Sequence, residues 1–150
     1  MNKPAFEPTL KGRALRLLSQ REHSRQELER KLAGHETEPG QLAKALDELQ
    51  ARGFISEARV IESVIHRRAG KLGTSRVRQE LAAKGLSGEA VAQALEGLRE
   101  TELARAREVW TRKFGEPARD PKEKARQIRF LVSRGFAAEV VRRVVQGADD

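Results

Sequence analysis

The residues best able to bind a metal or to transfer a proton in this sequence are three histidines, His23, His35 and His66. Their spacing matches neither HExxH nor any related metal-binding motif, so only a site assembled from separate helices could use all three. We expect instead that the histidines are exposed surface residues. The chain has no cysteine, which excludes disulfides and thiolate metal sites. We therefore predict no metal and no cofactor.

The segment closest to a catalytic motif is Gly73-Thr74-Ser75-Arg76-Val77. It lacks the second glycine and the preceding strand that a nucleophile elbow needs. Neither GxGxxG nor GxxxxGK[ST], the glycine-rich phosphate-binding motifs, is present. We expect Glu27 with Lys31, and Glu80 with Lys84, to form i,i+4 helix pairs rather than to act as catalytic carboxylates. The sequence therefore predicts a protein that is not an enzyme.

Trp110 and Phe114 lie one helical turn apart and have two interpretations. They could form a platform on which a nucleic acid base stacks. They could also anchor a hydrophobic core that is otherwise aliphatic, because aromatic residues make up only 4% of the chain. We favour the core.

Basic residues are the remaining candidates for function, since 30 Lys and Arg outnumber 22 Asp and Glu and give a net charge of +8. A chain with this charge is attracted to polyanions or to acidic protein surfaces. The span 67–84 holds six basic residues and a single acidic one, and basic residues also predominate in the span 122–134. From these spans we select seven partner contacts: Arg67, Arg68, Lys71, Arg76, Arg78, Arg126 and Arg129. The alternative is that they form only a solubilising surface.

Helices are predicted almost throughout from residue 10 onward, because apolar residues recur at three- and four-residue spacing. Ser24 followed by Glu27 forms a capping box, and Asp120 followed by Pro121 marks another helix start. The predicted helices span residues 10–21, 25–33, 41–52, 57–71, 75–84, 88–98, 100–114, 121–134 and 137–145. No apolar run has the length of a membrane span, and no apolar signal region follows Met1, so we expect a cytoplasmic protein.

An internal repeat organises these helices. At a shift of 50 residues, Lys84-Gly85-Leu86 aligns with Arg134-Gly135-Phe136, and an earlier copy aligns at a shift of 49. We predict an all-α fold of three tandem three-helix, helix-turn-helix-like repeats in an elongated curved array. The predicted boundaries are 10–55, 56–98 and 99–147, with a flexible tail at 1–9 and a C-terminal tail at 148–150. Each aligned glycine should end a helix in the left-handed conformation, with the next apolar residue folding back onto that helix.

Several of these segments resemble the RecX regulatory proteins. The stretch Gly53-Phe54-Ile55-Ser56-Glu57-Ala58-Arg59 resembles the junction between the first two repeats of that family. Residues 73–81 with Lys84-Gly85-Leu86 resemble its second-repeat signature, and Phe130-Leu131 with Arg134-Gly135-Phe136 its third. Residues 14–18, followed by Ser24, Glu27, Leu28 and Leu32, resemble the first repeat. The resemblance covers about residues 10–147.

The sequence departs from the family after the first junction, where an aromatic-Ala pair and a Tyr are usual. Here those positions are Val60, Ile61 and Val64, and the chain has no Tyr. Because apolar residues replace apolar ones, the departures bear on packing detail and leave the resemblance intact.

The resemblance implies a partner that the composition alone does not identify. RecX proteins bind the RecA recombinase and its filament on single-stranded DNA, and they inhibit its recombinase, ATPase and co-protease activities. The resemblance thereby implies a protein that modulates DNA repair and the SOS response. We also expect a monomer with weak non-specific DNA binding and no membrane contact. The alternative is a helix-turn-helix transcription regulator that binds duplex DNA with sequence specificity. Gel shifts at stated salt distinguish the two.

Overall fold

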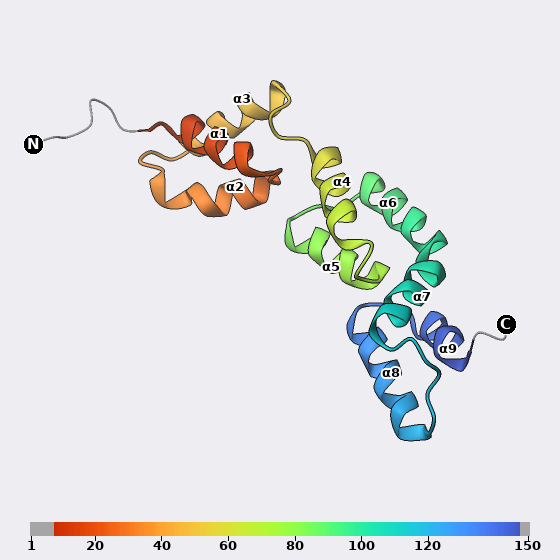
Figure 1. Cartoon of the computed structure of the whole chain (residues 1–150). Coiled ribbons are helices and arrows are strands. Elements are labelled where there is room, and N and C mark those ends of the chain that lie inside the picture. Colours follow the sequence, from red (N-terminus) through yellow and green to blue (C-terminus); the bar gives the residue numbers. More distant parts are fainter. Residues whose placement is uncertain (1–7, 148–150) are drawn as a thin grey trace, which may run out of the picture. The chain divides into compact units, whose positions relative to one another are not determined.

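A computed structural model describes residues 8–147, and within them the chain forms nine α-helices and no strand (Figure 1). The helices are α1 Leu10–Gln20, α2 Arg25–Leu32, α3 Gln41–Ala51, α4 Glu57–Arg68, α5 Thr74–Ala83, α6 Glu89–Glu100, α7 Glu102–Lys113, α8 Pro121–Ser133 and α9 Ala138–Gln146. A short 3-10 helix, η1 Ala33–His35, was not expected. The all-α prediction is confirmed. The predicted tails at 1–9 and 148–150 fall outside the described residues, except for residues 8 and 9.

The described chain divides into two compact units, which we treat separately. The first unit comprises the residues up to 60 together with Lys84–Leu86. Its core is formed by α1, α2 and α3, where Leu28, Leu46 and Leu49 are almost completely buried. Ser24 caps α2 and forms the predicted capping box with Glu27.

The turn Lys84–Leu86 is held to this first unit by polar contacts at the start of α2. The Ser24 hydroxyl donates to the Lys84 carbonyl oxygen at 2.7 Å, and Lys84 Nζ donates to Glu27 Oε2 at 3.1 Å. Glu27 also accepts from Arg21 and from the Ser24 amide, so the expected pair between Glu27 and Lys31 is wrong. Burial alone would raise the pKa of Glu27. The hydrogen bonds from Arg21, the Ser24 amide and Lys84 outweigh it and lower the pKa to about 2.

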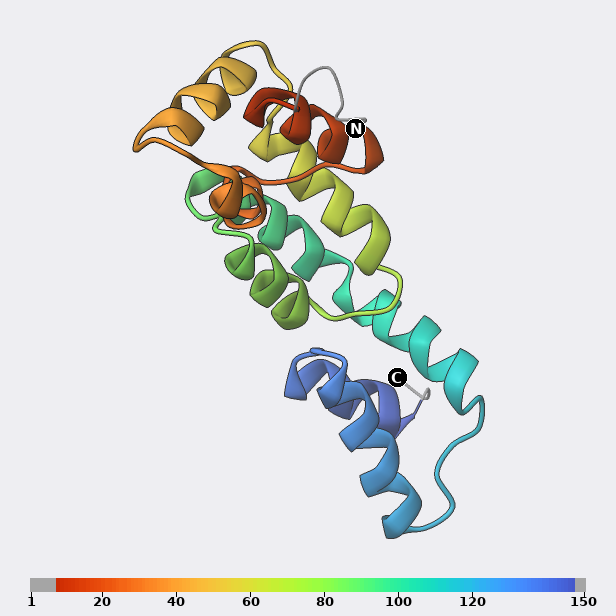
Figure 2. The same cartoon turned by 90° about the vertical axis from the view of Figure 1, so that its left-hand side faces the viewer.

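The second unit comprises residues 61–83 and those from 87 onward. In it α5 lies beside α6, and α9 packs against both α7 and α8 (Figure 2). The core of the last three helices is built from Ala106, Val109, Leu131, Phe136 and the valines of α9, with Trp110 packed against it. An amphipathic stripe of three- and four-residue spacing produces this burial, as the sequence predicts.

The α8–α9 turn shows why a glycine stands at position 135. Gly135 has a left-handed backbone conformation, with φ +93°. Its amide donates to the Val132 carbonyl oxygen, and the Phe136 amide donates to the Leu131 carbonyl oxygen. This is a Schellman cap, and Phe136, only 3% exposed, makes its hydrophobic contact. The predicted cap is confirmed.

Within the second unit, the start of α5 is joined to this same turn. The Gly73 amide donates to the Arg134 carbonyl oxygen at 2.7 Å, and the Ser75 amide donates to that of Gly135 at 3.3 Å. A Cβ atom at Gly73 would overlap the carbonyl group of Gly135, so the close approach of the two backbones requires glycine at position 73.

Glu102, only 4% exposed, completes this joint. One oxygen accepts from the amide of Thr74, at 3.1 Å, and from its hydroxyl, while the other accepts from the Ala137 amide at 2.8 Å. These two amides lie at the beginnings of α5 and α9, so one carboxylate satisfies donors at two helix N-termini. Arg105, 3.9 Å from Glu102, donates to the Leu72 carbonyl oxygen.

His23 is 1% exposed, so the expectation that it is a surface residue was wrong; His35 and His66 are exposed as expected. The Nδ1 atom of His23 lies 3.0 Å from the Arg21 carbonyl oxygen, and the Nε2 atom of His23 lies 3.2 Å from Lys31 Nζ. Because a lysine ammonium only donates, Nε2 accepts and Nδ1 carries the single proton. Burial is the main cause that lowers the pKa of His23, and the ring is neutral.

Candidate cationic interface

The two arginines at the end of α4 are paired with an acid on α5. Arg67 Nη2 lies 3.3 Å from one oxygen of Glu80, and Arg68 Nε lies 2.9 Å from the other. The expected pair between Glu80 and Lys84 is therefore wrong. Both arginine side chains are 43% exposed, so they connect α4 to α5 while remaining accessible to a partner.

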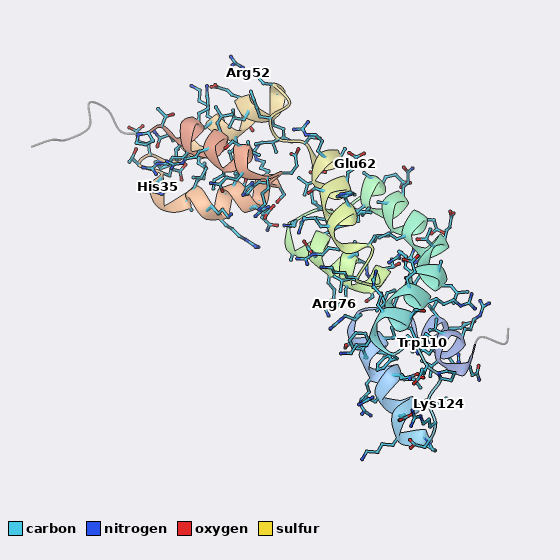
Figure 3. The ribbon with its side chains drawn as sticks, in the orientation of Figure 1. His35, Arg52, Glu62, Arg76, Trp110 and Lys124 are labelled. Atoms are coloured by element: carbon cyan, nitrogen blue, oxygen red, sulfur yellow. The ribbon has the colours of Figure 1, made fainter. Side chains whose placement is uncertain are left out.

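Arg76 and Arg78, both on α5, have different roles in the second unit. The Arg76 guanidinium donates to the Ser133 carbonyl oxygen at 2.6 Å, which adds to the joint with the α8–α9 turn (Figure 3). Arg78 is exposed and lines a hollow of about 310 Å³ beside the first turns of α5 and α9, with Arg99 and Glu102. Arg78 is therefore the more accessible side chain of the two.

Arg126 and Arg129 both lie on the exposed side of α8. The Arg126 guanidinium lies 6.0 Å from the ring centroid of Phe114, and no carboxylate within residues 8–147 forms an ion pair with either arginine. Phe114 meets Phe130 edge-on, with 5.5 Å between the ring centroids. Both arginines are thus accessible, and Arg126 lies beside a small aromatic cluster.

Trp110 is a core anchor, as we favoured. Its Nε1 donates to Oε1 of Gln127 at 2.9 Å, and the buried Gln127 side chain in turn donates to the Glu116 carbonyl oxygen (Figure 3). The indole ring packs against the core of α7–α9. Because the indole is part of the core, Trp110 cannot serve as a stacking platform.

Lys71 lines a cavity that the sequence did not reveal, between α7 and α8. This third-repeat hollow has a volume of about 290 Å³. None of its lining residues is acidic; they are Lys71, Val109, Arg112, Lys113, Phe130 and Arg134.

The first and second repeats carry hollows at the corresponding place, between their own first and second helices. The first-repeat hollow, of about 270 Å³, includes the basic residues Arg13, Arg16, Lys31 and His35 over Leu17 and Leu32. The second-repeat hollow is lined by Arg68, Leu72, Arg76, Gln79 and Glu80. Each repeat therefore presents basic side chains at the groove between its first two helices.

Part of this set was not predicted from the sequence, because these residues lie outside the dense basic runs. Arg13 and Arg16 stand three residues apart on α1, and Arg112 and Lys113 end α7. The available signal was their position on the first helix of a repeat, since residues three apart on a helix lie on one face.

Within the described part of the chain, no group of three or more His, Asp or Glu side chains is arranged to hold a metal ion. None of the helices in residues 8–147 is long and apolar enough to cross a membrane.

Each of the three repeats matches a domain of a known protein family. Models of the first, second and third three-helix domains of RecX match residues 11–49, 56–95 and 100–145. The chain belongs to the RecX family. A regulatory protein RecX from Leptothrix cholodnii is 55% identical, over 99% of this chain and 93% of its own length. One from Ralstonia nicotianae is 48% identical, over 94% and 89%.

Two solved structures show the same fold. A crystal structure of a regulatory protein RecX covers 92% of this chain and 72% of its own, with a TM-score of 0.74 at 19% identity. That of RecX from Lactobacillus salivarius covers 91% and 92%, with a TM-score of 0.69 at 19% identity. The predicted family and the tandem three-helix fold are confirmed, and the curated relatives are named regulatory proteins.

Proposed function

We propose that this chain binds the RecA recombinase, in particular its filament on single-stranded DNA, and inhibits its recombinase, ATPase and co-protease activities. Membership of a family of regulatory proteins supports the proposal. The observation that carries it is the recurrence of basic side chains at the same groove in each of the three repeats. In the cell, such inhibition would modulate DNA repair and the SOS response.

Repeated basic grooves suit a filament because a filament is itself a repeating polyanion. One contact between exposed charges contributes only about 0.2–1 kcal/mol. Several contacts on one chain act together, because the first raises the effective concentration of the others. A regulator with three such grooves therefore binds an assembled filament more tightly than a single RecA subunit.

Inhibition by occupancy needs no catalytic group. A chain bound along the filament blocks the surface where further subunits or a second DNA strand would attach. Because one blocked end stops growth of a whole filament, the inhibitor acts below one copy per RecA subunit.

A helix-turn-helix transcription regulator is less consistent with the second unit. Such proteins insert the N-terminal part of their recognition helix into the major groove. Here the beginning of α9 is occupied by the Glu102 carboxylate, which accepts from the Ala137 amide. The α8–α9 turn is likewise engaged by Gly73. Sequence-specific duplex binding in a gel shift would favour this alternative over the proposal.

The direct test is RecA-driven strand exchange with the purified chain added at less than one copy per RecA. We expect slower exchange and lower DNA-dependent ATP hydrolysis. If neither activity changes at an equimolar ratio, the proposal is wrong.

A further inference from the structure

The third-repeat hollow combines an apolar floor with a cationic rim. Val109 and the half-buried ring of Phe130 form the floor, on α7 and α8. Four basic residues surround it, Lys71 from the α4–α5 loop, Arg112 and Lys113 at the end of α7, and Arg134 at the end of α8. All of them belong to the second unit.

Contacts other than ion pairs position three of these basic groups. The Arg134 guanidinium lies 4.5 Å, and the Lys113 ammonium 5.1 Å, from the ring centroid of Phe130, which are cation–π distances. Arg112 Nη2 donates to the Gly70 carbonyl oxygen at 2.8 Å. These contacts orient the charged groups but do not neutralise them.

No carboxylate in residues 8–147 forms an ion pair with Lys71, Lys113 or Arg134. Elsewhere on the same unit the pattern differs, because Glu80 pairs with both Arg67 and Arg68. Like charges gathered around one hollow repel each other, and an anion that enters relieves this repulsion. The hollow is therefore suited to a negatively charged ligand that also carries an apolar group.

We propose that the third-repeat hollow binds an acidic peptide segment of a protein partner. One apolar side chain of that segment rests on Val109 and Phe130, and the flanking carboxylates pair with the basic rim. This deepens the proposed function, on which it rests, because it assigns the contact to the protein of the filament rather than to its DNA strand.

A nucleic acid strand fits the same hollow less well. Strand-binding proteins stack bases on open aromatic faces. The ring of Phe130 is half-buried, approached by Arg134 and Lys113 and met by the ring of Phe114, so only part of it lines the hollow and a whole base has no open face on which to stack. The basic rim pairs with carboxylates and with phosphates alike, so the apolar floor of Val109 and Phe130 is what favours a peptide side chain.

The test measures fluorescence anisotropy of labelled peptides with the full chain at fixed moderate salt. One peptide carries a single Leu flanked by Asp and Glu, a second has Ser in place of that Leu, and an oligo-dT of equal charge serves as competitor. We expect the Leu peptide to bind at least about fivefold more tightly than the Ser peptide, and more tightly than the oligonucleotide.

The charge-reversal variant is Lys71→Glu with Lys113→Glu, and its control is Arg142→Glu with Arg143→Glu on the exposed side of α9. The first should weaken binding of the Leu peptide by about tenfold or more, and the control, which changes net charge equally, by less than about threefold. Circular dichroism checks that both fold, and Lys71→Glu alone should show an intermediate loss.

Equal binding of the Leu and Ser peptides, equal losses in the two double variants, or tighter binding of the oligonucleotide would each overturn the inference. The same proteins are assayed for inhibition of RecA strand exchange. If the wild-type chain inhibits RecA but the peptide binding experiments give one of these contrary results, only this inference is wrong. If the peptide arms succeed and inhibition is absent, the proposed function falls.

Discussion

Replacement of Glu27 by Gln tests how the first unit holds the turn Lys84–Leu86. The Glu27 side chain is 15% exposed and accepts from Arg21, Lys84 and the Ser24 amide. These partners lower the pKa from 4.5 to about 2. A shift of this size corresponds to about 3 kcal/mol of stability at neutral pH, an order-of-magnitude value. Gln resembles the protonated acid, so we expect the variant to lose about that amount.

The sign of the pH dependence gives a second check. Because the pKa of Glu27 is lower in the folded chain, its contribution is complete above pH 4.5 and is lost as the pH falls toward 2. The difference between wild type and Glu27→Gln should therefore shrink steadily across that window. At neutral pH it is expected to be constant.

The assay is urea unfolding followed by circular dichroism at several pH values. Glu29→Gln is the matched control, because Glu29 lies on the same helix, is 48% exposed and pairs with Arg25 four residues away. The control should lose less than about 0.5 kcal/mol. If Glu27→Gln costs no more than Glu29→Gln, or if its cost is the same at pH 3 as at pH 7, the reasoning is refuted.

Three further predictions concern other buried contacts. Gly73→Ala should lower the free energy of unfolding by about 1–3 kcal/mol or more, because the new Cβ atom overlaps Gly135. Its control, Gly97→Ala, lies in open space on α6 and should raise the free energy of unfolding by about 0.5–1 kcal/mol. A smaller loss for Gly73→Ala than for a surface substitution would contradict this. Glu102→Ala should cost about 3–5 kcal/mol and accelerate hydrogen exchange of the two amides it accepts from, and unchanged exchange would count against the joint. Since burial lowers the pKa of His23, stability should be complete above pH 6.5 and decline below it, and His23→Gln should flatten that decline in thermal melts.

The helices and their repeat could be predicted because their signals are local. The capping box at Ser24 and the Asp120-Pro121 start are confirmed. Gly135 adopts the left-handed conformation for the same local reason, since it ends α8 in a Schellman cap. Periodicity, caps and turn residues act within a few positions of one another, so the sequence displays them directly.

The charge pairing could not be predicted because it depends on tertiary contacts. Helix spacing predicted that Glu27 pairs with Lys31 and that Glu80 pairs with Lys84. Instead, Glu27 pairs with Arg21 and Lys84, and Glu80 pairs with two arginines of α4. His23 was expected at the surface because nothing in its neighbours shows that it is buried. The third-repeat hollow could not be predicted either, because its basic residues come from three segments that only the tertiary fold brings together.

The central claim is that this chain recognises a RecA filament through basic grooves repeated along the chain. The most direct measurement is equilibrium binding, at two salt concentrations, to RecA filaments held on single-stranded DNA with a non-hydrolysable ATP analogue, and to the bare DNA. We predict tighter binding to the filament than to bare DNA at both salts, and weaker binding to the filament at the higher salt. Equal affinity for the two surfaces, or filament binding that is unaffected by salt, would contradict the claim.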